Sequence, residues 1–384
     1  MQAGRLMYGH ARDPATGENV DEVLASYMPA PRTYTREDVV EIDCHGGMVA
    51  LQRVLELALR EGARLAGPGE FTLRAFLNGR IDLSQAESVI DVVRAQTEAS
   101  LRVAVRQLEG GLAQEVRTVR AQVLDILAYL TATVDFTEDE IPPQDLAVPL
   151  QEVVARVEKL LSGADAGIVY RQGVRTAIVG RPNVGKSSLL NALLREARAI
   201  VTAVPGTTRD TVEEVVNIQG VPIVLIDTAG ITATDDVVER MGVERSRRAI
   251  EEADLVLLVV DGSQPLEDRD RVIARLAGPK PALLVVNKSD LPQHPEEQRL
   301  VQFAASRANV RVSATEGSGL PELEDAIVSI VFAGATRASD ALLVSNPRHK
   351  DALNRARSSL EAAAGGLSEG TPADCLTVDL PAAA

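Results

Sequence analysis

A glycine-rich segment, Gly180–Ser187, fits the pattern G-x-x-x-x-G-K-[ST] and directly follows the apolar residues 176–179. Small residues at these positions let successive backbone N–H groups converge on phosphate oxygens, at the positive end of the helix that follows. Lys186 would reach the β- and γ-phosphates, and the Ser187 hydroxyl would ligate Mg²⁺. The alternative is a glycine-rich turn without a ligand. The segment predicts binding of a nucleoside triphosphate by Gly180, Asn183, Val184, Gly185, Lys186, Ser187 and Ser188.

Two further motifs follow in the order that a GTPase requires, each directly after an apolar, strand-like run. The first, Asp227-Thr-Ala-Gly230, places a carboxylate where it can hold Mg²⁺ through water and the Gly230 N–H near the γ-phosphate. In the second, Asn287-Lys-Ser-Asp290, Asp290 can accept from guanine N1–H and the 2-amino group together, whereas adenine offers no such pair of donors. We expect the nucleotide to be GTP, bound by Asp227, Thr228, Ala229, Gly230, Asn287, Lys288 and Asp290.

Two loops complete the predicted site. Ser313-Ala314 follows the strand-like residues 310–312 and would offer a backbone N–H to guanine O6. In the segment 206–210, Thr208 is the expected switch residue, with its hydroxyl on Mg²⁺; the alternative is a polar surface turn.

Ile231 stands where Ras-type enzymes use glutamine to orient the attacking water. Either hydrolysis is very slow, or other groups orient the water and replace an arginine finger.

Composition bounds the class of protein. The chain has 384 residues, enough for two or three domains, and it is 45% hydrophobic and 25% charged, which is ordinary for a globular protein. Two cysteines, Cys44 and Cys375, make no disulfide framework, and no apolar signal segment opens the chain. We therefore expect a cytoplasmic protein without a membrane or DNA partner. With a net charge of −15, RNA binding would need a local basic patch or a partner protein.

The pattern along the chain indicates an inserted domain. From about residue 175 to 332, continuous apolar runs alternate with amphipathic stretches, which predicts a mostly parallel sheet covered on both faces. Apolar residues at helical spacing predict two long helices over 83–134, broken at Gly110-Gly111. Further helices are expected at about 150–161 and 349–364. Residues 1 to 79, with a strand at 39–43 and a helix at 49–60, are expected to form a small α+β unit.

Several motifs resemble the tRNA modification GTPase MnmE (TrmE) family, and the similarity covers nearly the whole chain. Pro68-Gly-Glu-Phe-Thr72 followed by Arg74-Ala-Phe-Leu-Asn78 is highly specific to that family. The resemblance implies an α/β P-loop GTPase domain inserted into an all-α helical domain and preceded by a truncated α+β folate-binding domain. The implied domains are a tetrahydrofolate-binding and dimerisation domain at 1–79, helical parts at 80–171 and 336–384, and a G domain at 172–335.

The resemblance also implies an activity. Family members hydrolyse GTP and, with a flavoprotein partner (MnmG) in a heterotetramer, build a carboxymethylaminomethyl or aminomethyl group on C5 of the wobble uridine of certain tRNAs. The one-carbon donor is a tetrahydrofolate derivative, 5-formyl or methylene. Glu41 and Arg80 fall where members contact folate; the alternatives are a strand-edge carboxylate and a cation at a helix start.

The resemblance also answers the question raised by Ile231. G domains of the family form a homodimer across bound K⁺, which takes the place of an arginine finger, and Glu239 matches the catalytic glutamate that positions water. Oxygen ligands suit such an ion. The positions that match the K⁺ site are Asn183, Thr202, Val204 and Thr207. Thr202, Thr207 and Thr208 would also contact GTP.

The ends of the chain depart from the family pattern. Members carry further N-terminal strands and a C-terminal helix with Cys-x-Gly-Lys, and Cys375 in Asp374-Cys-Leu-Thr does not match that motif. Two other functions therefore stay open. One is a regulatory or ribosome-assembly GTPase with no modification activity, and the other is a folate-binding module whose G domain serves as a conformational clamp.

Overall fold

The computed structural model describes residues 4–136, 141–196, 214–226, 241–278, 280–294, 308–332, 344–369, 371, 372, 375 and 377. The chain divides into two compact units. One is Met1–Ile90 with Leu108–Ala113, and the other is Asp91–Gln107 with Gln114–Ala384. The division into four domains that the sequence suggests stays a prediction.

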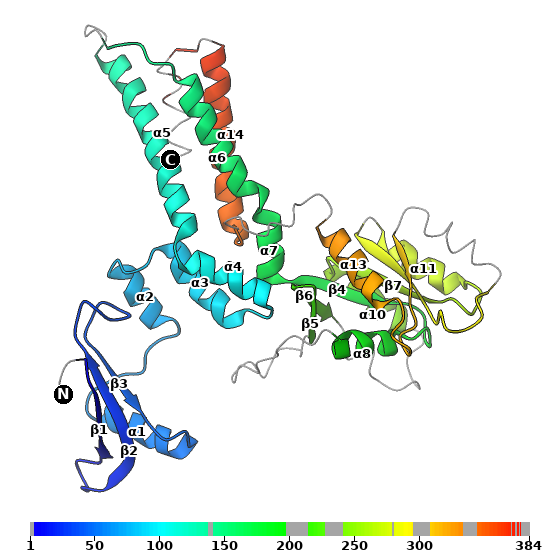
Figure 1. Ribbon diagram of the computed structural model, residues 1–384, viewed down its shortest axis with the longest axis horizontal. Coiled ribbons are helices and arrows are strands. Elements are labelled where there is room, and N and C mark those ends of the chain that lie inside the picture. Colours follow the sequence, from blue (N-terminus) through cyan, green and yellow to red (C-terminus); the bar gives the residue numbers. More distant parts are fainter. Residues whose placement is uncertain are drawn as a thin grey trace. The chain divides into compact units, whose positions relative to one another are not determined.

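The first unit contains a three-stranded antiparallel sheet in the order β1-β2-β3 (Figure 1). On one face, Val23 and Ala25 of the central strand are buried, as are Val54 and Leu57 of the neighbouring helix α1. The predicted strand at 39–43 and helix at 49–60 are confirmed, whereas β1, β2 and α2 are additional elements. The bounds are β1 (Leu6–Arg12), β2 (Asn19–Met28), β3 (Val39–Asp43), α1 (Met48–Arg60) and α2 (Glu70–Leu77).

The prediction of one long helix before Gly110 is wrong. The structure has two, α3 (Leu83–Arg94) and α4 (Glu98–Leu108), and then α5 (Gly111–Asp135). The Thr97 hydroxyl accepts a hydrogen bond from the Ser100 N–H at 3.1 Å, which caps the start of α4. Hydrophobic periodicity cannot detect this break, because the apolar spacing continues across it. The expected break at Gly110 is confirmed, and this glycine has a φ of +84°.

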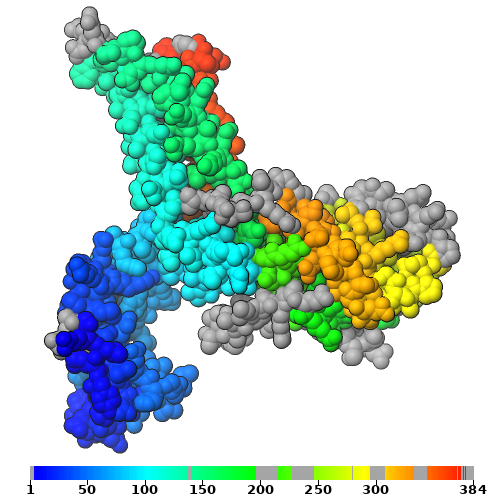
Figure 2. All heavy atoms as spheres, in the orientation of Figure 1, coloured from blue at the N-terminus to red at the C-terminus, as the bar shows by residue number. Residues whose placement is uncertain are grey.

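Helices far apart in the sequence pack together in the second unit. Figure 1 shows α5, α6 (Ala147–Ser162) and α14 (Pro347–Ser368) side by side, and Figure 2 shows the green and red atoms of α6 and α14 in contact. Their shared core includes Val123, Val157 and Leu360, each with 0% exposure. The helices predicted near 150–161 and 349–364 are confirmed, and α7 (Ala164–Gln172) is an additional helix.

The α/β part is a six-stranded sheet in the order β5-β6-β4-β7-β8-β9, in which only β5 runs antiparallel to its neighbour. The predicted sheet, mostly parallel and covered on both faces, is confirmed. One core joins the sheet to α8 and α13, and the other joins it to α10 and α11. The sequence analysis had not identified β5 and α11. The strands are β4 (Val174–Val179), β5 (Glu214–Ile218), β6 (Val221–Ile226), β7 (Leu255–Asp261), β8 (Ala282–Asn287) and β9 (Asn309–Arg311). The helices are α8 (Lys186–Glu196), α10 (Met241–Glu252), α11 (Asp268–Ala277) and α13 (Leu320–Val331).

The turn of the β5–β6 hairpin contacts α4 of the helical part. The Thr97 hydroxyl donates a hydrogen bond to the Gly220 carbonyl at 2.8 Å. Gly220 has a φ of +91°, and a Cβ there would lie 3.3 Å from the Cβ of Ala99. Glycine therefore meets both the backbone conformation and the close approach that this turn requires.

None of the helices in the described ranges combines the length and the apolar character needed to cross a membrane.

Candidate active site

The phosphate loop connects the end of β4 with the start of α8, as the sequence predicts. Asn183 and Gly185 both have positive φ, 62° and 94°. A Cβ at Gly180 would overlap the Val259 carbonyl of the neighbouring strand, and one at Gly185 would overlap the Asn287 side-chain nitrogen. The two glycines thus let the loop backbone pack closely against β7 and Asn287. This packing shapes the loop, here called the phosphate cradle, whose backbone amides would bind a phosphate group.

Lys186 begins α8 and lies across this loop. Its ammonium group donates hydrogen bonds to the carbonyls of Gly180, at 2.9 Å, and Arg181, at 2.7 Å. Ser187 is exposed in the first helical turn, and Ser188 is half-buried. The predicted lysine and serine therefore lie at the N-terminus of the helix, beside the cradle. Their chemistry fits a triphosphate with Mg²⁺.

Asn287 connects three loops of the predicted site. Its side chain is buried, its Nδ2 donates to the Val184 carbonyl at 2.8 Å, and its Oδ1 accepts from the Ala314 N–H at 3.1 Å. The Ser313 N–H donates to the Ser318 carbonyl at 2.9 Å. The structure thus brings the phosphate loop and the two predicted base loops together through one amide. The contact of Ser313 and Ala314 with guanine O6 stays a prediction.

Lys288 is held by a residue that the sequence analysis had not identified, Asp261. The two side chains form a 2.7 Å ion pair, and Lys288 has a φ of 63°. Burial raises the pKa of the Asp261 carboxyl, but hydrogen bonds from Lys288 and Ser263 more than offset this, so the pKa lies below its usual value. Asp290, the predicted guanine acceptor, is exposed two residues beyond Lys288. The only sequence signal for Asp261 is its position at the end of a buried strand.

Ten residues that the sequence analysis singled out lie outside the described residues, and their roles stay predictions. They are Thr202, Val204, Thr207, Thr208, Asp227, Thr228, Ala229, Gly230, Ile231 and Glu239.

The two predicted folate residues both lie on the surface of the first unit. Glu41 is exposed on β3, opposite Ser26 of β2. Arg80 is exposed, and its guanidinium carbon lies 4.5 Å from the centre of the Tyr34 ring, a cation–π arrangement. Among the described residues, no hydrogen bond or ion pair joins Glu41 to Arg80. Folate binding by these two residues stays a prediction.

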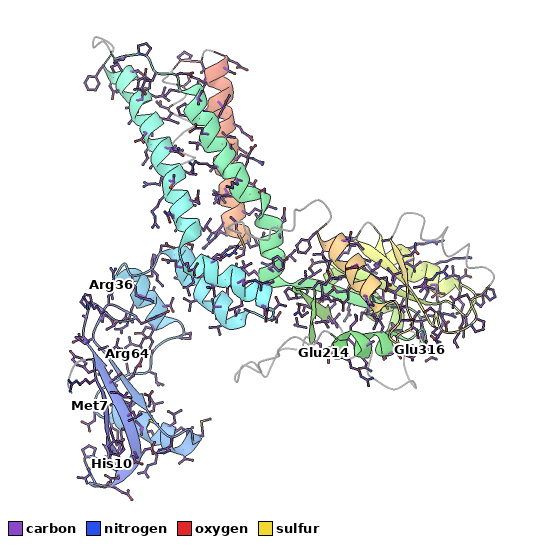
Figure 3. The ribbon with its side chains drawn as sticks, viewed as in Figure 1. Met7, His10, Arg36, Arg64, Glu214 and Glu316 are labelled. Carbon is purple, nitrogen blue, oxygen red and sulfur yellow. The ribbon has the colours of Figure 1, made fainter. Side chains whose placement is uncertain are left out.

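A cavity of about 360 Å³ opens beside α2 in the same unit. Glu70, from the family signature, lies at its wall and accepts from Arg64 at 2.6 Å, Arg74 at 2.7 Å and the Gly67 N–H at 2.8 Å (Arg64 is labelled in Figure 3). The Arg64 guanidinium, then Arg74 and the Gly67 amide, hold the pKa of the Glu70 carboxyl far below its usual value. The lining residues are Thr35, Glu37, Asp38, Val39, Val40, Arg64, Ala66, Glu70, Phe71 and Arg74.

The sheet and the loops at its strand ends define the class of protein. The phosphate loop follows β4, the Asn287 loop follows β8, and the Ser313 loop follows β9, so all three lie at the carboxyl ends of parallel strands. This is where open α/β sheets bind their ligands. The phosphate cradle and the guanine-type motif with Asp290 together define a P-loop GTPase.

Comparison with known proteins identifies the family. The family model "MnmE helical domain" matches residues 83–384, more than half of the chain, and "GTP-binding protein TrmE N-terminus" matches residues 2–80. The tRNA modification GTPase MnmE of Chloroflexus aurantiacus is 52% identical over 385 residues, 100% of this chain and 85% of its own length. That of Alkaliphilus metalliredigens is 50% identical over 379 residues, 98% of this chain and 82% of its own. The chain belongs to the MnmE (TrmE) family and is a GTP-hydrolysing enzyme.

Among solved structures, the G domain of the FeoB iron transporter of T. maritima is 26% identical to this chain. The match covers 41% of this chain and 98% of that one, with a TM-score of 0.29.

Replacing Gly185 by alanine tests the cradle. The added Cβ would overlap Asn287 at a backbone conformation that alanine rarely adopts, so we expect the affinity for GTP to fall by at least about tenfold. Titration with a fluorescent GTP analogue measures this. Gly365→Ala on α14 is the control, because a Cβ there meets nothing within 4 Å. Unchanged affinity in a folded Gly185→Ala protein would contradict the assignment.

Glu70 makes the stability of the first unit depend on pH. Its pKa is lowered in the folded state, so its contribution is fully present above the ordinary glutamate pKa of about 4.3 and is lost as pH falls through the lower folded value. We expect Glu70→Gln to lower the melting temperature of the full chain at pH 7 and to flatten its fall below about pH 4. Thermal unfolding across this range is the measurement, with Glu56→Gln on exposed α1 as the control. Parallel pH profiles for the Glu70→Gln and wild-type proteins would contradict the role of the Arg64–Glu70–Arg74 contacts.

Proposed function

We propose that this chain hydrolyses the acid anhydride of GTP to drive modification of the wobble uridine of certain tRNAs. With an MnmG-type flavoprotein it would add a carboxymethylaminomethyl or aminomethyl group at C5, taking one carbon from a 5-formyl or methylene derivative of tetrahydrofolate. The observation that carries this proposal is the sequence identity of 50%, over 98% of the chain, to a protein named tRNA modification GTPase MnmE. The proposed location of this activity is the cytoplasm.

The binding of GTP and Mg²⁺ follows from the loops around β4 and β8. Bound Mg²⁺ would neutralise charge that develops on the phosphates. The loop amides and Lys186 would orient the β- and γ-phosphates, while Ser187 and Thr208 would hold the ion directly and Asp227 through water. Asp290 would accept from guanine, and the pairing of Lys288 with Asp261 supports this role because it fixes the backbone next to the base loop.

Potassium is proposed to take the place of an arginine finger across a homodimer of G domains. Ile231 cannot orient water, so the enzyme needs other groups for this step. Asn183 supports the proposal because it is exposed in the phosphate loop, with a left-handed backbone. Its side-chain oxygen would be one hard ligand, with Thr202, Val204 and Thr207 supplying the others. Glu239 would then position the attacking water.

Folate binding and the partner proteins are the remaining parts of the proposal. Residues 1–79 would bind the tetrahydrofolate derivative through Glu41 and Arg80 and would support the homodimer. The helical parts at 80–171 and 336–384 would frame the G domain at 172–335 and contact the flavoprotein. The match of residues 2–80 to the TrmE N-terminus supports the first assignment, and the match of 83–384 to the MnmE helical domain supports the second.

Complementation of a bacterial strain that lacks its own tRNA modification GTPase tests the function. We expect the chain to restore the aminomethyl-type uridine in bulk tRNA, measured by mass spectrometry of nucleosides. A Lys186→Ala variant is the matched control, because it should lose the nucleotide site and leave the tRNA unmodified. Active GTP hydrolysis without restored uridine would favour the alternative of a regulatory or ribosome-assembly GTPase.

The potassium and Glu239 assignments share one kinetic experiment. We expect GTP turnover to be at least about tenfold faster in KCl than in NaCl at equal ionic strength, since the ion replaces an arginine finger. Glu239→Ala should retain GTP affinity and lose turnover in KCl, because it changes the attacking water and leaves the binding loops intact. Equal rates in the two salts would reject the potassium site, and retained turnover of the variant would reject Glu239.

A further inference from the structure

A cluster of charged and polar side chains, two of them buried, lies beside the phosphate loop, outside the residues that the nucleotide motifs identify. Its centre is Arg181, the second residue of the loop, whose side chain is 8% exposed. The guanidinium donates to Glu267 and, at 3.1 Å, to Gln264, and its Nε lies 3.6 Å from an Asp270 oxygen. A planar guanidinium suits several acceptors at fixed positions.

Two of the acceptors, Glu267 and Asp270, lie at the start of α11, a helix packed against the sheet. Glu267 caps α11 and Asp270 lies in its first turn, and the two form a reciprocal capping box in which the Glu267 N–H donates to Asp270 at 3.0 Å. Asp270 is 1% exposed, and Ile273 and Ala274 of the same helix are buried against the sheet. The guanidinium is therefore attached to an element that packing holds in place.

The main chain of Arg181 contacts Lys186, the residue predicted to reach the phosphates. Its carbonyl oxygen accepts from the Lys186 ammonium at 2.7 Å, next to the same interaction at Gly180. Arg181 thus bonds to α11 through its side chain and to Lys186 through its main chain. A rotation of this residue would move both the loop backbone and the lysine that reaches the phosphates.

We propose that Arg181 is a positioning residue for the phosphate loop. The acceptors at the start of α11 hold its guanidinium, which fixes the backbone of the loop and the ammonium group of Lys186 for the β- and γ-phosphates. The base loop has an ion pair of its own, between Asp261 and Lys288, that does not involve Arg181. Arg181 therefore sets the affinity for phosphate groups and leaves the preference for guanine unchanged.

Arg181→Lys separates this role from simple charge compensation. A buried carboxylate such as Asp270 needs a nearby cation, and lysine supplies one. Lysine is a point charge and cannot reproduce the planar set of contacts to Glu267, Gln264 and Asp270. If Arg181 only balances charge, the Arg181→Lys protein keeps both the fold and the nucleotide affinity of the wild type. If Arg181 positions the loop, the variant keeps the fold but binds nucleotide more weakly.

The experiment measures nucleotide binding by the full-length Arg181→Lys protein. We expect a melting temperature close to that of the wild type, and dissociation constants for GDP and GTP that both rise about tenfold. The faster release of a fluorescent GDP analogue should account for most of this loss. The ratio of GTP to XTP affinity should not change, because the base loop keeps its own ion pair.

Arg271→Lys on the same helix is the matched control, since Arg271 makes an exposed 3.2 Å ion pair with Asp268. It should leave both nucleotide affinities unchanged. A folded Arg181→Lys protein that binds GDP as the wild type does would overturn the proposal, as would an equal loss in the control. If Arg181→Lys does not fold, Glu267→Gln replaces it, because Glu267 is 54% exposed and glutamine keeps its shape. We then expect GDP affinity to fall about threefold, and unchanged affinity would overturn the proposal.

Discussion

The nucleotide site depends on one buried amide. Asn287 donates to the phosphate loop at Val184 and accepts from the base loop at Ala314, so a single planar group sets the spacing between the two ends of the ligand. An amide suits this place because it carries a donor and an acceptor at a fixed separation without a charge. Gly185 is required at the same point, since a side chain there would occupy the position of the amide. Asn287 therefore holds together the phosphate loop, its own loop at 287–290 and the loop at Ser313-Ala314.

The sheet fixes the positions of these loops, so a small number of side-chain contacts between them is enough. β4, β7 and β8 are parallel neighbours with fully buried interiors, so their carboxyl ends lie at one edge and move little relative to each other. Each strand ends in a polar segment, and the segment after β7 is the one without a nucleotide motif. It supplies Asp261 to Lys288, and the loop that continues from it supplies Gln264 to Arg181. The segment thus contacts the residues that flank both sides of the nucleotide site.

Much of this architecture could be predicted from the sequence, because apolar runs and glycine motifs are local signals. The strand before the phosphate loop ends in three apolar residues, and the strand before Asn287 is continuously apolar. The helices around 150–161 and 349–364 have clear periodicity. The break at Thr97 was missed, because it depends on one hydroxyl cap, which hydrophobic periodicity does not register. Arg181 and Asp261 were also missed. Their partners lie 86 and 27 residues away, and only the folded sheet brings them together. Family resemblance supplied the tRNA chemistry, which neither periodicity nor spacing contains.

The β5–β6 hairpin has a consequence for how the two parts of the second unit communicate. β5 begins at Glu214, six residues after the predicted switch threonine, and β6 ends one residue before Asp227. The turn between them is hydrogen-bonded to Thr97 at the start of α4. Both segments that are predicted to contact the γ-phosphate are thus continuous in the chain with two strands, and the turn that joins these strands is hydrogen-bonded to the helical part. Thermodynamic linkage makes such an attachment work in both directions. A nucleotide state that shifts the hairpin must bias the helices, and whatever binds the helices must, to the same extent, bias the choice between GTP and GDP.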